Sequence, residues 1–178
     1  MTDTALGPEG VTRFLVVCGP RTGSNMLCSA LNSHPRIVCL REVYNFILED
    51  VIDYYVDGYD NRSASDLELR RSDPVEYART RLFGQDPATT DAAGFKYMYD
   101  HVWGFPGLLE ALQSDTDIRI VHLMRRNGVR AFLSYKMAQA TGEWQRPKPR
   151  PLLTRIGYAA THPLHTITTQ FGRARATV

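Results

Sequence analysis

The chain has 178 residues, of which 43% are hydrophobic and 22% are charged, and its formal net charge is +2. These values are typical of a soluble globular protein with one core, and no apolar run approaches the roughly 20 residues that cross a membrane. Residues 1–10 lack the basic start and the apolar stretch of a secretory signal, so we expect a cytoplasmic protein.

The charges are distributed unevenly along the chain. Residues 1–143 hold all 19 acidic residues and 15 Lys and Arg, whereas residues 144–178 hold six Lys and Arg and no acid. A basic segment of this kind occurs in proteins that bind nucleic acid or anionic membranes. The segment lacks the clustering and the interleaved aromatic residues of a binding arm, so we do not expect a nucleic-acid partner.

The apolar positions alternate between strand and helix spacing, which is typical of an α/β protein with a parallel sheet and helices on both faces. In chain order the pattern predicts strand 13–18, helix 24–32, strand 37–40, helices 44–56 and 74–82, strand 94–99, helix 105–113, strand 118–124 and helix 127–140. The polar residues 59–73 favour neither state. Residues 118–124 form a near-continuous apolar run, which is typical of a strand buried on both faces.

Cap and turn residues support several of these boundaries. Ser72 or Asp73 is expected to cap the helix at 74–82, Asn127 to begin the last helix and Gly142 to end it. We therefore assign residues 11–144 to one α/β domain.

The remaining residues, 145–178, begin with a proline-rich run and show little periodicity. One interpretation is a basic tail that is extended or poorly ordered. The other is a shortened or aberrant chain whose usual last helices are missing.

The most informative segment is residues 18–28, with the sequence CGPRTGSNMLC, which joins the first strand to the first helix. The first N–H groups of a helix have no internal partner, and the helix dipole favours negative charge there. Arg21 adds a permanent cation suited to a phosphate or a sulfate. The pattern indicates a site for an anionic ester; the alternative is a tight turn that only joins the two elements.

This loop differs from the Walker A loop of nucleotidases, which has four residues between its glycines and then Gly-Lys-Ser/Thr. Here three residues separate Gly19 from Gly23, Ser24 follows directly, and the cation is Arg21 instead of a lysine. Such a loop is poorly equipped for a triphosphate and better suited to a less charged group. A kinase-like nucleotide-binding protein is the competing interpretation.

Other polar residues lie near predicted strand ends. Glu42 follows the strand at 37–40, where a general base would be useful, although the position equally suits a helix cap. Lys96 lies in an apolar strand and must reach either solvent or an anion. Arg126 and Ser134 are eight residues apart, and by pattern alone they are surface polar groups.

The cysteines give no metal signal, and the histidines, His101, His122, His162 and His165, give a weak one. Cys18, Cys28 and Cys39 are odd in number, lack metal-ligand spacing and have apolar neighbours, so we expect buried free thiols. His162 and His165 are three residues apart, but Pro163 disfavours a helix there and no third ligand is evident. We therefore expect no metal site.

Taken together, these residues resemble those of the sulfotransferases that use 3′-phosphoadenosine 5′-phosphosulfate (PAPS). The segment from Pro20 to Asn25 resembles their 5′-phosphosulfate loop, and Arg126 with Ser134 resembles their 3′-phosphate motif. Residues 41–44, Arg-Glu-Val-Tyr, resemble the segment that carries the proposed base in the bacterial trehalose sulfotransferase-like branch. The histidine that cytosolic animal enzymes carry two residues after a strand lysine is Met98 here, which favours Glu42 as the base.

The resemblance implies a P-loop-type three-layer fold, with a central parallel sheet flanked by helices. It implies transfer of a sulfuryl group from PAPS to an acceptor hydroxyl, on a carbohydrate or glycolipid, without a metal. Its catalytic residues would be Glu42, Arg21 and Lys96, and the residues that hold PAPS would be Arg21, Thr22, Gly23, Ser24, Asn25, Arg126 and Ser134. The alternatives are a P-loop kinase-like protein and a truncated non-catalytic remnant; a homodimer is compatible with the apolar positions at 43–55.

Overall fold

The structure is a computed structural model that describes residues 5–45 and 63–142. The chain divides into two compact units, Met1–Arg125 and Arg126–Val178, and each is described by itself. The predicted domain boundary near residue 144 stays a prediction. Most of the predicted helix at 44–56, and all of residues 145–178, lie outside the described residues.

The first unit is built on a parallel sheet whose strands lie in the order β2-β3-β1-β4. The strands are β1 (Thr12–Cys18), β2 (Ile37–Leu40), β3 (Ala92–Met98) and β4 (Arg119–Leu123). All four match predicted strands, which confirms an α/β fold with a central parallel sheet. Because the strands are parallel, their carboxyl ends, and the loops that leave them, lie at the same edge of the sheet.

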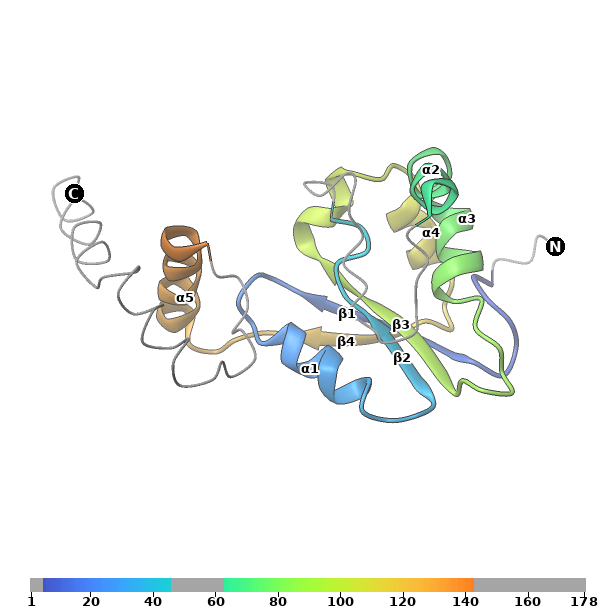
Figure 1. Cartoon of the computed structure of the whole chain (residues 1–178), viewed down its shortest axis with the longest axis horizontal. Helices are drawn as coiled ribbons and strands as arrows, with labels where there is room; N and C mark the ends of the chain where they lie inside the picture. The colour runs from blue at the N-terminus through green and yellow to red at the C-terminus, as the bar shows by residue number, and fades with distance from the viewer. Residues whose placement is uncertain (1–4, 46–62, 143–178) are drawn as a thin grey trace, which may run out of the picture. The chain divides into compact units, whose positions relative to one another are not determined.

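One face of the sheet packs against α1 (Ser24–Leu31), which lies on the opposite side of the sheet from the other helices of this unit (Figure 1). The small core here consists of Phe14, Val16, Cys28 and Cys39. All three cysteines are buried free thiols, as predicted. The amide of Asn32, just after α1, donates to the Cys39 carbonyl oxygen at 2.8 Å and accepts from the Cys39 N–H at 2.7 Å, which ties the end of α1 to β2.

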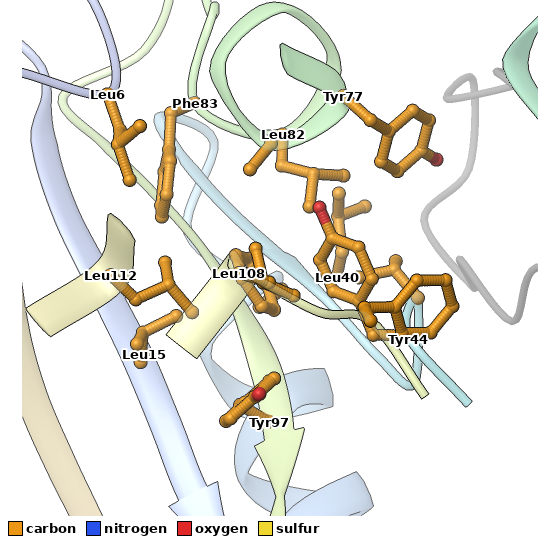
Figure 2. Close-up of a cluster of buried hydrophobic side chains, with 14 of the residues drawn as sticks. Leu6, Leu15, Leu40, Tyr44, Tyr77, Leu82, Phe83, Tyr97, Leu108 and Leu112 are labelled. Carbon is orange, nitrogen blue, oxygen red and sulfur yellow. The ribbon is translucent and has the colours of Figure 1, made fainter. Parts of the chain in front are cut away.

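The other face carries the larger core and three helices. These are α2 (Ala64–Ser72), α3 (Pro74–Tyr77), which continues as a π-helical stretch (Ala78–Leu82), and α4 (Leu108–Ser114). Figure 2 shows side chains of α3, the π-helical stretch and α4 gathered with those of the strands; the labelled ones include Tyr77, Leu82, Leu108, Leu112, Leu15, Leu40 and Tyr97. Helices on both faces of a parallel sheet confirm the predicted three-layer arrangement.

The structure corrects one prediction and decides one segment that the sequence left open. The strand at 118–124 is not buried on both faces: Ile120 is 58% exposed and Val121 is 40% exposed, because β4 is an edge strand of the described sheet. The undecided residues 59–73 include α2. Its N-cap Ser63 accepts a hydrogen bond from the Asp66 N–H at 3.1 Å, a capping pattern that its sequence contains.

A buried ion pair joins β1 to the turn after α4, near the amino ends of the strands. Arg13 and Asp115 are 6% and 5% exposed, and Arg13 Nε lies 3.1 Å from Asp115 Oδ2. The Leu6 N–H donates to the same oxygen at 2.9 Å. Burial alone would raise the pKa of Asp115, but the hydrogen bonds and the Arg13 charge outweigh it, and the pKa is lowered.

The second unit contains α5 (Gly128–Thr141) among its described residues. The Asn127 side chain accepts from the Arg130 N–H at 2.9 Å and caps the helix, and Gly142 ends it with a φ of 70°. Both boundaries confirm the prediction.

Candidate functional site

The loop between β1 and α1 leads into a helix whose first turn carries no acidic residue. Gly23 is the N-cap with a φ of 93°, a left-handed conformation that favours glycine. Within the described part of the chain, no side chain caps this end of α1, and its first turn holds no acidic residue. The N–H groups of Ser24 and Asn25 therefore belong to the set that an α-helix leaves without an internal acceptor, which is how helices bind anions.

The preceding residues hold the loop in a tight turn. The Thr22 hydroxyl donates to the carbonyl oxygen of Gly19 at 3.0 Å, across the turn. Arg21 has a φ of 60°, which is uncommon for a residue other than glycine. Its carbonyl oxygen accepts a hydrogen bond from Arg125 Nη1 at 3.1 Å.

A charged network connects this helix start with the carboxyl ends of β2 and β3. Lys96, on β3, has a side chain only 2% exposed. Its Nζ donates to Asn25 Oδ1 at 2.7 Å and to Glu42 Oε1 at 2.5 Å. The Asn45 amide donates to the other carboxylate oxygen of Glu42 at 2.9 Å. The structure therefore brings together three residues that are distant in the sequence: Asn25 is 71 positions from Lys96, and Glu42 is 54 positions from it.

The electrostatics of the network keep Glu42 ionised. Burial by itself would raise the pKa of Glu42, but the charge and hydrogen bond of Lys96, with the hydrogen bond from Asn45, outweigh it and lower the pKa. The Glu42 side chain is 23% exposed, so it is not sealed off from solvent. A carboxylate has about four acceptor positions. Glu42 can therefore keep both observed bonds and still accept a proton from an incoming hydroxyl.

His101 is a buried member of this region whose position the sequence analysis did not find. It lies in a 3₁₀ turn (Tyr99–Trp103) that follows β3, and its Nδ1 accepts from the Met98 N–H at 3.4 Å. Burial lowers its pKa to about 4; the charges of Asp100 and Glu42 oppose that shift, and the charge of Lys96 adds to it. His101 is therefore neutral at physiological pH. The spacing of residues in the sequence could not predict this position, because it depends on the turn that follows β3.

The base of the loop rests on a buried thiol. Ser24 is 7% exposed, and Cys18 at the end of β1 is fully buried. Burial raises the pKa of Cys18, although Ser24 and Lys96 oppose the shift. A buried thiol with a raised pKa is a poor nucleophile, which argues against a chemical role for Cys18.

The other two predicted site residues lie in the second unit. Arg126 precedes the cap of α5, and Ser134 is one of the residues of that helix. Their relation to the loop stays a prediction.

Three further findings delimit the site. Among the described residues, no group of three His, Cys, Asp or Glu side chains is gathered in a way that could hold a metal ion. In the same part of the chain, every helix is too short or too polar to span a membrane. A hollow of about 440 Å³, lined by Gly7, Arg79 and Gly84 among others, lies near the amino ends of the strands, away from the loop.

Comparison with known proteins gives one similarity. No family model matches the chain, and no solved structure matches it. The chain is 25% identical over 136 residues to nodulation protein H from Rhizobium tropici, which covers 76% of this chain and 50% of that protein. The chain therefore spans about half the length of the curated relative that it matches.

Proposed function

We propose that the protein is a sulfotransferase, which moves a sulfuryl group from PAPS to the hydroxyl of an acceptor, a carbohydrate or a glycolipid. The observation that carries the proposal is the bridge from Asn25 through Lys96 to Glu42, because it connects an anion-binding helix start to an ionised carboxylate. The similarity to nodulation protein H supports a sulfotransferase at the level of the family.

The loop fits the phosphosulfate end of such a donor. The start of α1 has no side-chain cap and no acidic residue in its first turn, and Arg21 lies close before it in the chain. Such a site suits an anion with one or two negative charges. Arg21, Thr22, Gly23, Ser24 and Asn25 would bind this end. Arg126 and Ser134 would bind the 3′-phosphate, as the resemblance of their spacing implies.

Glu42 would act as the general base. The donor, when bound, supplies a sulfur atom with a good leaving group. Glu42 takes the proton of the acceptor hydroxyl as the new S–O bond forms and the bond to the leaving phosphate oxygen breaks. Sulfuryl transfer resembles phosphoryl transfer, in which positioning and charge stabilisation dominate. Arg21, Lys96 and the N–H groups at the start of α1 would stabilise the charge that develops on the leaving oxygen.

A binding experiment on the full chain tests the proposal. We expect adenosine 3′,5′-bisphosphate, the product of the donor, to raise the melting temperature without Mg²⁺; a ligand at 100 times its Kd adds about 2.7 kcal/mol. Stabilisation by ATP only in the presence of Mg²⁺ would support the kinase-like alternative instead. No stabilisation by either nucleotide would support the non-catalytic remnant and overturn the proposal.

Two substitutions separate binding from chemistry. Glu42→Gln should reduce turnover by about 10² to 10⁴-fold while adenosine 3′,5′-bisphosphate still binds, since a positioned base is worth that much. Arg126→Ala should weaken nucleotide binding. Near-normal turnover of the first variant, or an unchanged Kd of the second, would remove that residue from its assigned role.

A further inference from the structure

Two residues that the proposed chemistry does not use contact the anion-binding loop from the strands on either side of β1. Tyr99 directly follows β3, and Arg125 lies two residues after β4. Both strands pair with β1, whose carboxyl end leads into the loop at Gly19. The loop is thus contacted from two neighbouring strand ends as well as from its own helix.

The Tyr99 ring lies against the loop at Gly19. A Cβ atom built on Gly19 would lie 3.3 Å from Cε2 of the Tyr99 ring, closer than most such contacts, and 3.6 Å from Cδ2, an ordinary contact distance. The Tyr99 hydroxyl is 2.7 Å from Nε2 of His122 on β4, so the ring is fixed at its far end. Tyr99 is 52% exposed, so it is not a core residue.

The contact with Arg125 supports the least favourable backbone in the loop. Arg21 has a φ of 60°, a left-handed conformation that is unfavourable for residues other than glycine. Such a conformation persists only where the surrounding structure holds it. Arg125 Nη1 donates to the carbonyl oxygen of this residue at 3.1 Å. That hydrogen bond restrains the peptide plane between Arg21 and Thr22, which precedes the free N–H groups at the start of α1.

We propose that Tyr99 and Arg125 are positioning residues, which hold the loop in its anion-binding conformation before a ligand arrives. A site that is ordered in advance binds more tightly, because the ligand does not have to order it. This inference rests on the proposed function only in the choice of ligand, adenosine 3′,5′-bisphosphate. Neither side chain needs to touch that ligand.

The test uses conservative variants and matched controls. Tyr99→Phe removes the bond to His122 and keeps the ring, and Arg125→Lys keeps the charge but loses the guanidinium geometry. The controls are Trp103→Ala, an 82% exposed aromatic residue of the same turn, and Arg119→Lys, at the amino end of β4. We expect Kd to rise about 3- to 10-fold in the first two variants, the effect of one hydrogen bond, and to stay unchanged in the controls.

A double substitution shows whether the ring acts through the loop. Gly19→Ala should push the ring away and weaken binding, and Tyr99→Ala should weaken it by a similar factor. If the ring positions the loop, adding Gly19→Ala to Tyr99→Ala should change Kd less than Gly19→Ala does alone. Fully independent effects would contradict the proposal.

Amide hydrogen exchange without ligand keeps this inference separate from the proposed function. Residues 19–25 should exchange faster in Tyr99→Ala and Arg125→Lys than in the unaltered chain, with unchanged exchange in β3 and no change in the two controls. Unchanged exchange of the loop would overturn the inference, even if the nucleotide binds. Absence of nucleotide binding to the unaltered chain would overturn the proposed function, while faster loop exchange in the variants would still support the positioning role.

Discussion

The ion pair between Lys96 and Glu42 should stabilise the fold as well as the site, and a double-mutant cycle can measure it. The cycle consists of Lys96→Met, Glu42→Gln and the double variant. Methionine keeps most of the length of the lysine side chain and removes its charge. Glutamine keeps the shape of the glutamate, and the Asn45 amide can still donate to its carbonyl oxygen.

The expected magnitude follows from burial. Removing one partner of a buried pair costs about 3–5 kcal/mol, because an uncompensated charge stays behind. The Lys96 side chain is 2% exposed and that of Glu42 is 23% exposed, so solvent lowers the penalty, and we expect about 2–3 kcal/mol for Lys96→Met. In that variant burial is no longer opposed by the Lys96 charge, and the pKa of Glu42 rises. Adding Glu42→Gln should then change stability little, which corresponds to a coupling of about 1–3 kcal/mol.

Urea denaturation followed by far-UV circular dichroism provides the assay. With an m value of about 2 kcal/mol/M, the Lys96→Met variant should unfold at a urea concentration about 1 M lower. The chain contains its own control in Arg36 and Asp91, whose ion pair is as short, at 2.6 Å, but 40% and 59% exposed. Exposed pairs contribute little, so the same cycle on Arg36 and Asp91 should give a coupling too small to resolve.

Two outcomes would refute the reasoning. If the effects of Lys96→Met and Glu42→Gln add without coupling, the short contact has no energetic consequence. If the exposed pair couples as strongly as the buried one, burial is not what gives the interaction its strength.

Three other predictions follow from the described contacts. Asp115→Asn should cost about 3 kcal/mol because it removes the buried partner of Arg13 and leaves only Asp117, which is 84% exposed and 3.7 Å away. Since the pKa of Asp115 is lowered on folding, the difference from the unaltered chain in urea midpoint should shrink as pH falls below about 4. Because the pKa of Glu42 is lowered, the acid limb of the turnover profile should lie below the usual range of a glutamate, and a limb near pH 6 would argue against Glu42 as the base. Gly94→Ala should destabilise by about 3 kcal/mol in thermal unfolding, since its Cβ would lie 2.2 Å from the Phe14 carbonyl oxygen.

Local signals in the sequence were sufficient for the order of elements. The strands, the start of α1 and both ends of α5 are encoded by neighbouring residues, such as the cap at Asn127 and the stop at Gly142. The loop from Gly19 to Ser24 could be identified for the same reason, because a glycine turn between a strand and a helix is a local pattern. The helix at Ala64–Ser72 also has a local signal, its Ser63 cap, which the polar composition of the segment obscured.

Burial could not be predicted in the same way, because it depends on where an element lies in the sheet. The apolar run around Ile120 has the composition of a central strand, yet the strand order places it at an edge of the described sheet. Conversely, the sequence left two options for Lys96, solvent or an anion. Lys96 is buried because β3 lies between β1 and β2 in the sheet, and the anion that it contacts is Glu42.

The sequence by itself therefore determined the α/β pattern, the anion-binding loop and the candidate acid–base residues, since each depends on contacts within a few residues. Only the tertiary structure decided which of them meet: it placed Glu42 and Asn25 on the two sides of Lys96, and it brought Tyr99 against Gly19. The physical reason is that parallel pairing aligns strand ends that are distant in the chain, and no local preference of the backbone encodes that alignment.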